Sequence, residues 1–254
     1  MSRDKHHGGS PSIEQPDYWW YRARSELLRV ALERYVGSPG RILDVGSADG
    51  PSVGWLRGRG QHVSLDLDPR GLASGGVCGS VFHLPFADGV FDVVTAFDVV
   101  EHCDPEHAAL EELHRVLAPG GRLLLSVPAY QWAWTGFDEE NGHHRRYTRS
   151  RARQAVEQSG LVVDRATYAF MSVFPAFTAE RLVRKLRERR EGGGAQAPAD
   201  VVGVPAVSPR IEQLLLRLTR VDERLLRGRD LPFGSSVFVA ATKPAAAEPV
   251  AATV

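Results

Sequence analysis

The sequence predicts an α/β fold with a mostly parallel sheet, and three observations support this. Strand-like apolar segments alternate with stretches of helical periodicity between residues 17 and 243, as in repeated strand–helix–strand units. The first five strand-like segments are continuous apolar runs, the pattern of central parallel strands buried on both faces. The chain has 254 residues, of which 43% are hydrophobic, so it can bury one sizeable core.

The predicted strands cover residues 41–46, 62–67, 77–79, 91–97, 121–127, 161–169 and 235–242. A helical segment at 17–36 precedes them, and a helical insertion at 175–231 separates the last two. A Gly-, Ala-, Pro- and Val-rich linker at 191–209, which we expect to be mobile, joins the two helices of the insertion. Residues 1–16 and 244–254 are expected to be disordered tails, so the predicted domain is 17–243.

Composition argues against several classes of function. The formal net charge is +0, so no overall field favours nucleic acid as a partner. No apolar run reaches the roughly 18 residues of a transmembrane helix, and no signal peptide is recognisable, so we expect a cytoplasmic protein. Cys78 and Cys103 fit neither a disulfide framework nor a zinc-ligand spacing, so no metal is predicted.

A small-residue turn follows the first strand and is the most informative segment of the chain. It runs from Asp44 to Gly50 as Asp-Val-Gly-Ser-Ala-Asp-Gly, and such a turn lets a ligand approach the backbone. An acid at its head opposes a pyrophosphate and favours a ligand with positive charge. Asp66 follows 22 positions later at the tip of the second strand, where it can accept hydrogen bonds from ribose hydroxyls.

These residues resemble motif I of the class I S-adenosylmethionine-dependent methyltransferases. Segments 79–102 and 112–128 resemble the corresponding regions of the type 11 small-molecule subgroup. The resemblance implies a Rossmann-like seven-stranded sheet, mostly parallel with the last strand antiparallel, with helices on both faces. It also implies S-adenosylmethionine as cofactor. The cofactor-binding residues that we predict are Asp44, Gly46, Ser47, Ala48, Gly50, Asp66, Leu67, Ser80, Val81 and Phe97.

Two of these positions depart from the family pattern. Ala48 replaces the middle glycine of motif I, and Ser80 stands where the family commonly has an acid that contacts the adenine amino group. Both departures leave open an alternative function, a cofactor-binding scaffold or regulator without catalysis. A nicotinamide-dependent oxidoreductase is disfavoured by Asp44.

Two aromatic segments are candidates for binding the methyl acceptor. In the N-terminal segment, Trp19, Trp20 and Arg22 either anchor the helix by packing or form a lid over cofactor and acceptor. The loop after the fifth strand lies where α/β enzymes bind substrate. Its predicted acceptor-binding residues are Tyr130, Trp132, Trp134 and Arg146.

Catalysis of methyl transfer to a hydroxyl or ammonium benefits from a general base. We predict His143 as this base, with His144 as second candidate and Tyr147 orienting the acceptor. A stretch Gly-His-x-Arg-Arg-Tyr-Thr also occurs in a subgroup that this chain resembles. Alternatively, His143 only tethers the loop. His102 competes for the role of base, but the resemblance favours a structural or cofactor-side role for it.

The insertion at 175–231 allows several interpretations. It can clamp the acceptor, form a dimer surface, lie as a basic amphipathic helix on an anionic membrane, or pack as a helical hairpin with a solvated basic face.

The predicted function is transfer of a methyl group to an O or N atom of a small molecule. Candidate acceptors include a natural product, a sugar or a lipid-linked molecule. The oligomeric state is left open.

Overall fold

The structure is a computed structural model that describes residues 17–46, 50–72, 74–190 and 207–245. One seven-stranded sheet has the order β3-β2-β1-β4-β5-β7-β6. Its strands are β1 (Arg41–Val45), β2 (Gln61–Asp66), β3 (Val77–Cys78), β4 (Phe91–Phe97), β5 (Leu117–Pro128), β6 (Val162–Ala169) and β7 (Ser236–Thr242). The predicted residues Ser47 and Ala48, and most of the predicted linker and tails, lie outside the described residues.

All neighbouring strands are parallel except β7, which pairs antiparallel with both β5 and β6. This confirms the predicted Rossmann-like sheet. The fifth strand begins at Leu117, earlier than the predicted residue 121, because Leu117 already pairs with Phe91 before a register shift to Arg122 and Val93. Such an irregularity has no apolar signature in the sequence.

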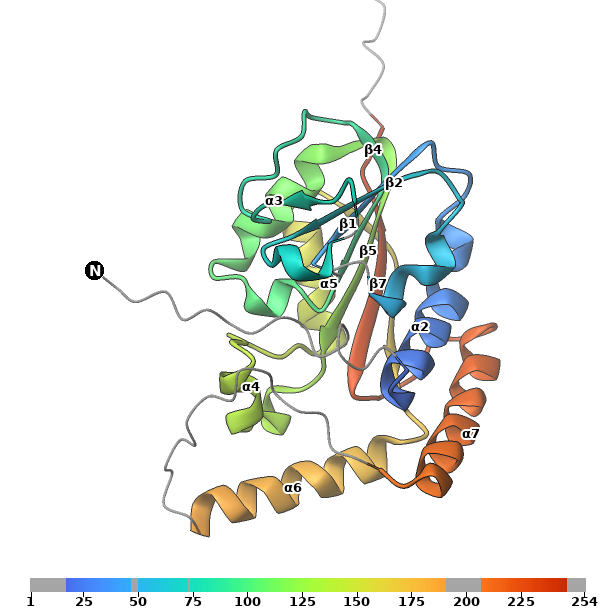
Figure 1. Ribbon diagram of the computed structural model, residues 1–254, viewed down its shortest axis with the longest axis vertical. Coiled ribbons are helices and arrows are strands. Elements are labelled where there is room, and N and C mark those ends of the chain that lie inside the picture. Colours follow the sequence, from blue (N-terminus) through green and yellow to red (C-terminus); the bar gives the residue numbers. More distant parts are fainter. Residues whose placement is uncertain (1–16, 47–49, 73, 191–206, 246–254) are drawn as a thin grey trace, which may run out of the picture.

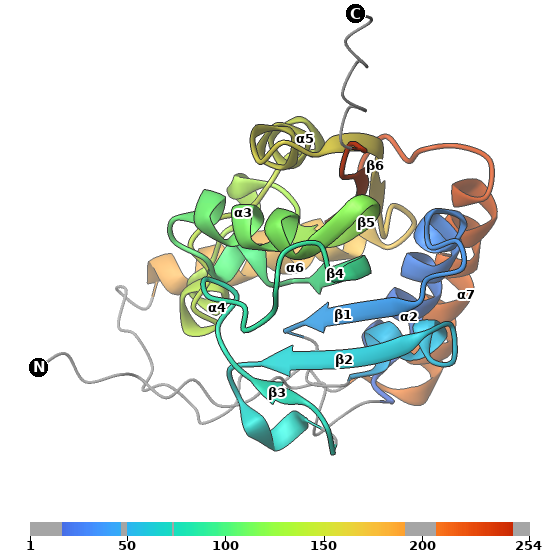
Figure 2. The same ribbon diagram turned by 90° about the horizontal axis from the view of Figure 1, so that it is seen from above.

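Helices cover both faces of the sheet. They are α2 (Trp19–Leu32), α3 (Glu106–Val116), α4 (Gly136–Glu140), α5 (Arg149–Gln158), α6 (Phe174–Arg190) and α7 (Pro209–Leu226), with short 3₁₀ helices η1 (Glu33–Tyr35), η2 (Pro51–Leu56), η3 (Pro69–Gly71), η4 (Val100–His102) and η5 (Gln131–Ala133). Figures 1 and 2 show α3 and α5 on one face and α2 and α7 on the other. The strands between them are therefore buried on both sides, with Leu123, Leu124 and Val239 fully inaccessible.

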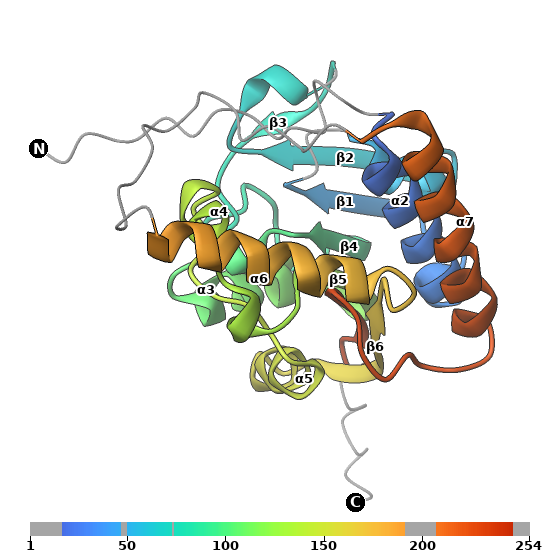
Figure 3. The ribbon, with the colours of Figure 1, turned by 90° about the horizontal axis from the view of Figure 1, so that it is seen from below.

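The two helices of the insertion pack against different elements, so they do not form a helical hairpin, which was one of the interpretations of this segment. Helix α7 packs along α2, whereas α6 lies against η5 and crosses the edge of the sheet where the parallel strands end (Figure 3). The side chains of Arg181 and Glu188 on α6 bond to Thr135 Oγ1 at 2.6 Å and to the Gly136 N–H at 3.0 Å. These two bonds hold helix α6 over the loop that follows β5. Among the described helices, none has the length and apolarity needed to span a bilayer.

Candidate active site

The turn after β1 requires a glycine at residue 46. Gly46 has a φ of +73°, and a Cβ added there would lie 2.4 Å from Cγ2 of Val99. The backbone conformation and the contact each exclude a side chain, so the glycine is required at this position. The 3₁₀ helix η2 begins at Pro51, directly after Gly50.

Asp44 lies beneath this turn and does not line an open crevice. Its side chain is fully buried, and Oδ1 accepts a hydrogen bond of 2.6 Å from Thr95 Oγ1 on the neighbouring strand β4. His62 Nε2 on β2 lies 4.0 Å from Oδ2. The predicted direct contact with the cofactor is therefore corrected for this residue: Asp44 supplies negative charge from behind the turn.

Asp66 ends β2 at the same edge of the sheet. Its Oδ1 accepts a 2.9 Å hydrogen bond from the Asp68 N–H, and the neighbouring Leu67 is 71% exposed. Across from it, Ser80 Oγ accepts a 3.3 Å hydrogen bond from the Phe82 N–H, and Val81 is buried. The predicted cofactor residues at the end of β2 and just after β3 thus lie near one another, because the Gly46 N–H donates to the Leu65 carbonyl and the Gly79 N–H to the Asp66 carbonyl.

Arg24 on α2 is a site residue that the sequence interpretation missed. It is 4% exposed, and its guanidinium forms an ion pair of 2.8 Å with Asp98 Oδ2 and donates to Ser126 Oγ at 2.8 Å and to Ser52 Oγ. These partners stand at the ends of β4 and β5 and in η2. Arg24 therefore ties the N-terminal helix to the edge of the sheet beside the crevice, and its helical spacing from Trp20 was the available signal.

Arg22, which the sequence predicts as part of a lid over cofactor and acceptor, does not face the sheet edge that Arg24 joins. Residues two apart on a helix face opposite ways, so Arg22 points outward, where it forms an exposed 3.4 Å ion pair with Glu212 of α7. Trp20 stacks on Phe170 with ring centroids 5.8 Å apart, and the Arg24 guanidinium lies 5.2 Å from its centroid. Trp19 packs against the core. These contacts support the packing interpretation of the aromatic segment.

An Asp–His pair occupies the loop after β5. His143 Nδ1 lies 2.9 Å from Oδ1 of Asp138, which is fully buried in α4. Burial opposes ionisation of Asp138, but the bond to His143 and the charge of Arg146 outweigh it and lower its pKa to about 2. With Nδ1 engaged by a carboxylate, Nε2 of His143 is the ring nitrogen that can bind a proton or an acceptor group.

Three other predicted site residues of this loop form hydrogen bonds within the protein. Arg146 is 7% exposed and bonds to Asp138 Oδ1 at 2.7 Å, so it is not available to an acceptor. Tyr147 is 1% exposed and donates to Glu106 Oε2 at 2.5 Å, which corrects its predicted role in orienting the acceptor. His144 has an exposed side chain, and its backbone N–H donates to the Glu101 carbonyl at 2.8 Å.

The aromatic residues after β5 form a partly exposed cluster under α6. Tyr130 stacks on Trp132 and on Tyr168, with centroid distances of 5.9 and 5.2 Å, and Trp132 is 43% exposed. Phe174 of α6 lies 6.2 Å from Trp132. Trp134 stands aside and donates from Nε1 to Glu139 at 3.2 Å. Two of the three predicted aromatic acceptor residues are thus brought together.

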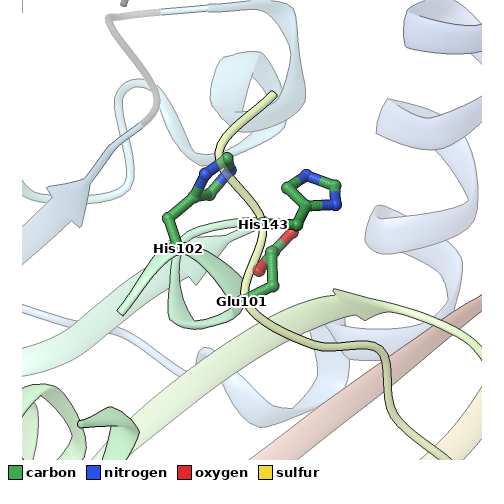
Figure 4. Close-up of side chains that lie close together, drawn as sticks. All are labelled: Glu101, His102 and His143. Atoms are coloured by element: carbon green, nitrogen blue, oxygen red, sulfur yellow. The ribbon is translucent and has the colours of Figure 1, made fainter. Parts of the chain in front are cut away.

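Glu101, His102 and His143 form a further cluster at this edge. One donor atom from each lies within 4.8 Å of the others, and the two imidazole rings meet edge to face at 4.6 Å. Figure 4 shows the Glu101 carboxylate beneath the rings. Glu101 and His143 are 42 positions apart in the sequence, so a search for short metal-ligand spacings could not find this set.

The class of this site agrees with comparisons with known proteins. Residues 43–125 match the family model of a methyltransferase domain. The chain is 36% identical over 116 residues to the demethylmenaquinone methyltransferase of Mycolicibacterium vanbaalenii, a match that covers 43% of this chain and 48% of that protein. It is 32% identical over 137 residues to the biotin biosynthesis bifunctional protein BioHC of Cellvibrio japonicus, covering 48% of this chain and 27% of that protein. The matches thus span less than half of these curated relatives.

Solved structures show the same fold over nearly the whole chain. The [4+2]-cyclase SpnF has a TM-score of 0.56 at 19% identity, covering 95% of this chain and 88% of its own. The N-methyltransferase NodS of Bradyrhizobium japonicum, in complex with S-adenosylhomocysteine, has a TM-score of 0.52 at 14% identity, covering 91% of each chain. The predicted methyltransferase class and S-adenosylmethionine as its cofactor agree with these findings.

Proposed function

We propose that the chain is an S-adenosylmethionine-dependent methyltransferase that acts on an O or N atom of a small molecule. The observation that carries the proposal is the edge shared by β1 and β2: the Gly46 N–H donates to the Leu65 carbonyl at 2.7 Å, so the backbone after β1 stands beside the Asp66 tip, with the buried Asp44 charge at the end of β1. A sulfonium ligand suits an acidic crevice, and a ribose suits a strand-tip carboxylate.

The remaining predicted cofactor residues fit this placement. Leu67 offers an exposed apolar side chain beside Asp66, where an adenosine ring would cover it. Ser80 and Val81 stand on the opposite wall, and Phe97 ends β4 next to the Gly46 turn, with Gly50 opening η2. Arg24 holds this edge together through Asp98.

The bound cofactor would supply an electrophilic methyl group, and the chain would supply position and proton transfer. Alignment of nucleophile and methyl accounts for much of the rate of such displacements. We assign the base to His143 Nε2, because Asp138 engages Nδ1 and fixes the ring. The His143 side chain is 12% exposed, so it is in part accessible to solvent while Asp138 holds it.

The aromatic cluster of Tyr130, Trp132 and Phe174 is the proposed acceptor surface. It stands at the same sheet edge as His143, because residues 129 and 147 form a parallel bridge between the two parts of the loop. Exposed stacked rings bind flat or apolar molecules well. Helix α6 covers this surface, which favours the acceptor clamp among the interpretations of the insertion.

A second candidate function is cofactor binding without methyl transfer. The specific observation in its favour is that a structure with this fold is that of a [4+2]-cyclase. In this case S-adenosylmethionine would bind, but no acceptor would gain a methyl group. The fold alone therefore does not separate the two functions.

Two measurements separate these functions. Calorimetry should show S-adenosylhomocysteine binding and no NAD binding; the reverse would exclude both candidates. Incubation with S-adenosylmethionine labelled in its methyl group and a metabolite extract should then yield a product that carries the label. Tight binding without any labelled product from diverse extracts would favour the scaffold function.

A further inference from the structure

The cluster of Glu101, His102 and His143 has the composition of a metal site. Two imidazoles and one carboxylate approach one another from η4 and from the loop after α4 (Figure 4). Glu101 is buried, His143 is half-buried and His102 is exposed, so the cluster is open to solvent at His102. A cation therefore has an entry path that leaves the core undisturbed.

Glu101 supplies an independent observation that points to a ligand. Its side chain is fully buried, and neither carboxylate oxygen has a hydrogen-bond partner among the described residues. Buried carboxylates are ordinarily bonded or coordinated, because burying an unpaired polar group costs several kcal/mol, of order 2–7.

We propose that Glu101, His102 and His143 bind one divalent transition-metal ion. Two histidines and one carboxylate suit Zn²⁺, Fe²⁺, Co²⁺ or Mn²⁺ and leave coordination positions open. His143 would bind through Nε2, because Nδ1 lies against Asp138. A carboxylate that holds the second nitrogen of a ligating histidine is a regular feature of metal sites, and here Asp138 has that position.

The geometry requires only a small closure. Ligand atoms of a tetrahedral ion with bonds of about 2.1 Å lie about 3.4 Å apart. The present limit of 4.8 Å thus calls for a shift of little more than an ångström. His102 is the exposed member, so rotation of its side chain can supply this shift.

The proposed metal ion and the proposed general base share one atom, Nε2 of His143. A cation and a proton exclude each other at His143 Nε2, so a loaded chain would activate an acceptor oxygen by coordination, whereas a metal-free chain would use His143 as base. The binding of the ion itself does not depend on methyl transfer. Its test uses neither cofactor nor acceptor, so failure of either proposal leaves the other standing.

The test is titration of the full chain with Co²⁺, followed by visible absorption and by competition with Zn²⁺. Because His6, His7 and Cys78 can also bind metals, the background protein carries His6→Ala, His7→Ala and Cys78→Ser. We expect saturable binding of one ion per chain and a Zn²⁺-dependent rise in melting temperature. Glu101→Gln should abolish both effects while melting normally without metal, because it keeps the shape of the carboxyl group.

Matched variants define the site further. Asp138→Asn should weaken Co²⁺ binding by about 10- to 100-fold through loss of the support to His143. His107→Ala changes an exposed histidine of α3 and should bind Co²⁺ as the background protein does. Absence of saturable binding in the background protein, or equal binding by the Glu101→Gln variant, would overturn the proposal.

Discussion

At the scale of single residues, the site combines Gly46, a position that excludes a side chain, with His143, a side chain that a buried carboxylate orients. Gly46 is required because its φ is +73° and Val99 fills the space where a Cβ would stand. His143 is oriented because a buried carboxylate with two arginines around it holds Nδ1. In both cases the residue that imposes the geometry, Val99 or Asp138, is not itself proposed to touch a ligand.

Gly46→Ala should abolish binding of S-adenosylhomocysteine in calorimetry. The new methyl group meets Val99 and the backbone must also leave a φ of +73°. Gly58→Ala is the matched control, because Gly58 has a φ of +78° with open space around it, so this change costs only about 1–2 kcal/mol of backbone strain. Partial recovery of affinity in the Gly46→Ala/Val99→Ala double variant would confirm the contact, and unchanged affinity in Gly46→Ala would contradict the placement of the cofactor.

His143→Gln should lower kcat for methyl transfer by about 10²- to 10⁴-fold, the usual contribution of a general base. His144→Gln should change kcat little, because its side chain is exposed and only its backbone takes part in the cluster. The measurement is the initial rate with labelled cofactor on the metal-free protein. Equal losses in both variants would remove the distinction between the two histidines.

At the scale of elements, the alternation of strands and helices could be predicted because buried parallel strands leave continuous apolar runs. The sequence could not predict which side chains outside the strands face the site. Arg22 and Arg24 differ by half a helical turn, and the sequence does not say which of them faces the sheet. The sequence predicts that Tyr147 orients the acceptor, but a tyrosine packs in a core equally well when a carboxylate such as Glu106 accepts a hydrogen bond from its hydroxyl.

Helix α3 is joined to the wall of the crevice by Glu112, which gives a pH-dependent prediction. Its carboxylate accepts from Arg115 Nε at 2.6 Å and from the Leu84 N–H at 2.8 Å, and chiefly the bond from Arg115 lowers its pKa. A lowered pKa means that this stabilisation is fully present above about pH 4.5 and disappears as the pH falls through the folded-state value.

Glu112→Gln should therefore lower the free energy of unfolding by roughly 1–2 kcal/mol at pH 7, with a difference that shrinks in acid. Urea titrations at several pH values measure it. Glu111→Gln on the exposed side of the same helix is the control and should be near neutral at each pH. A difference that is constant from pH 7 to pH 3 would show that the ion pair is not its source.

At the scale of the whole molecule, Arg24 connects the N-terminal helix to the ends of β4 and β5. Arg24→Met should cost about 2–4 kcal/mol, since it removes one partner of a largely buried pair. It should also weaken binding of S-adenosylhomocysteine, because Ser52 and Asp98 lose the group that holds them beside the crevice.

Arg29→Met is the matched control on the same helix. Arg29 forms only partly exposed pairs with Glu26 and Glu33, which contribute little. Thermal melts and calorimetry on both variants test the difference. Equal affinity for S-adenosylhomocysteine in the wild-type protein and the Arg24→Met variant would show that the helix does not support the cofactor site.

The position of β7 also has a consequence for synthesis of the protein. Residues 236–242 fit between β5 and β6, so these two strands have no permanent neighbour on that side while the ribosome is still adding residues before 236. A nascent polypeptide thus exposes two open strand edges until residues 236–242 have emerged and paired. Chaperones that shield such edges should be retained on ribosomes stalled before residue 236 and absent from the folded protein after its release.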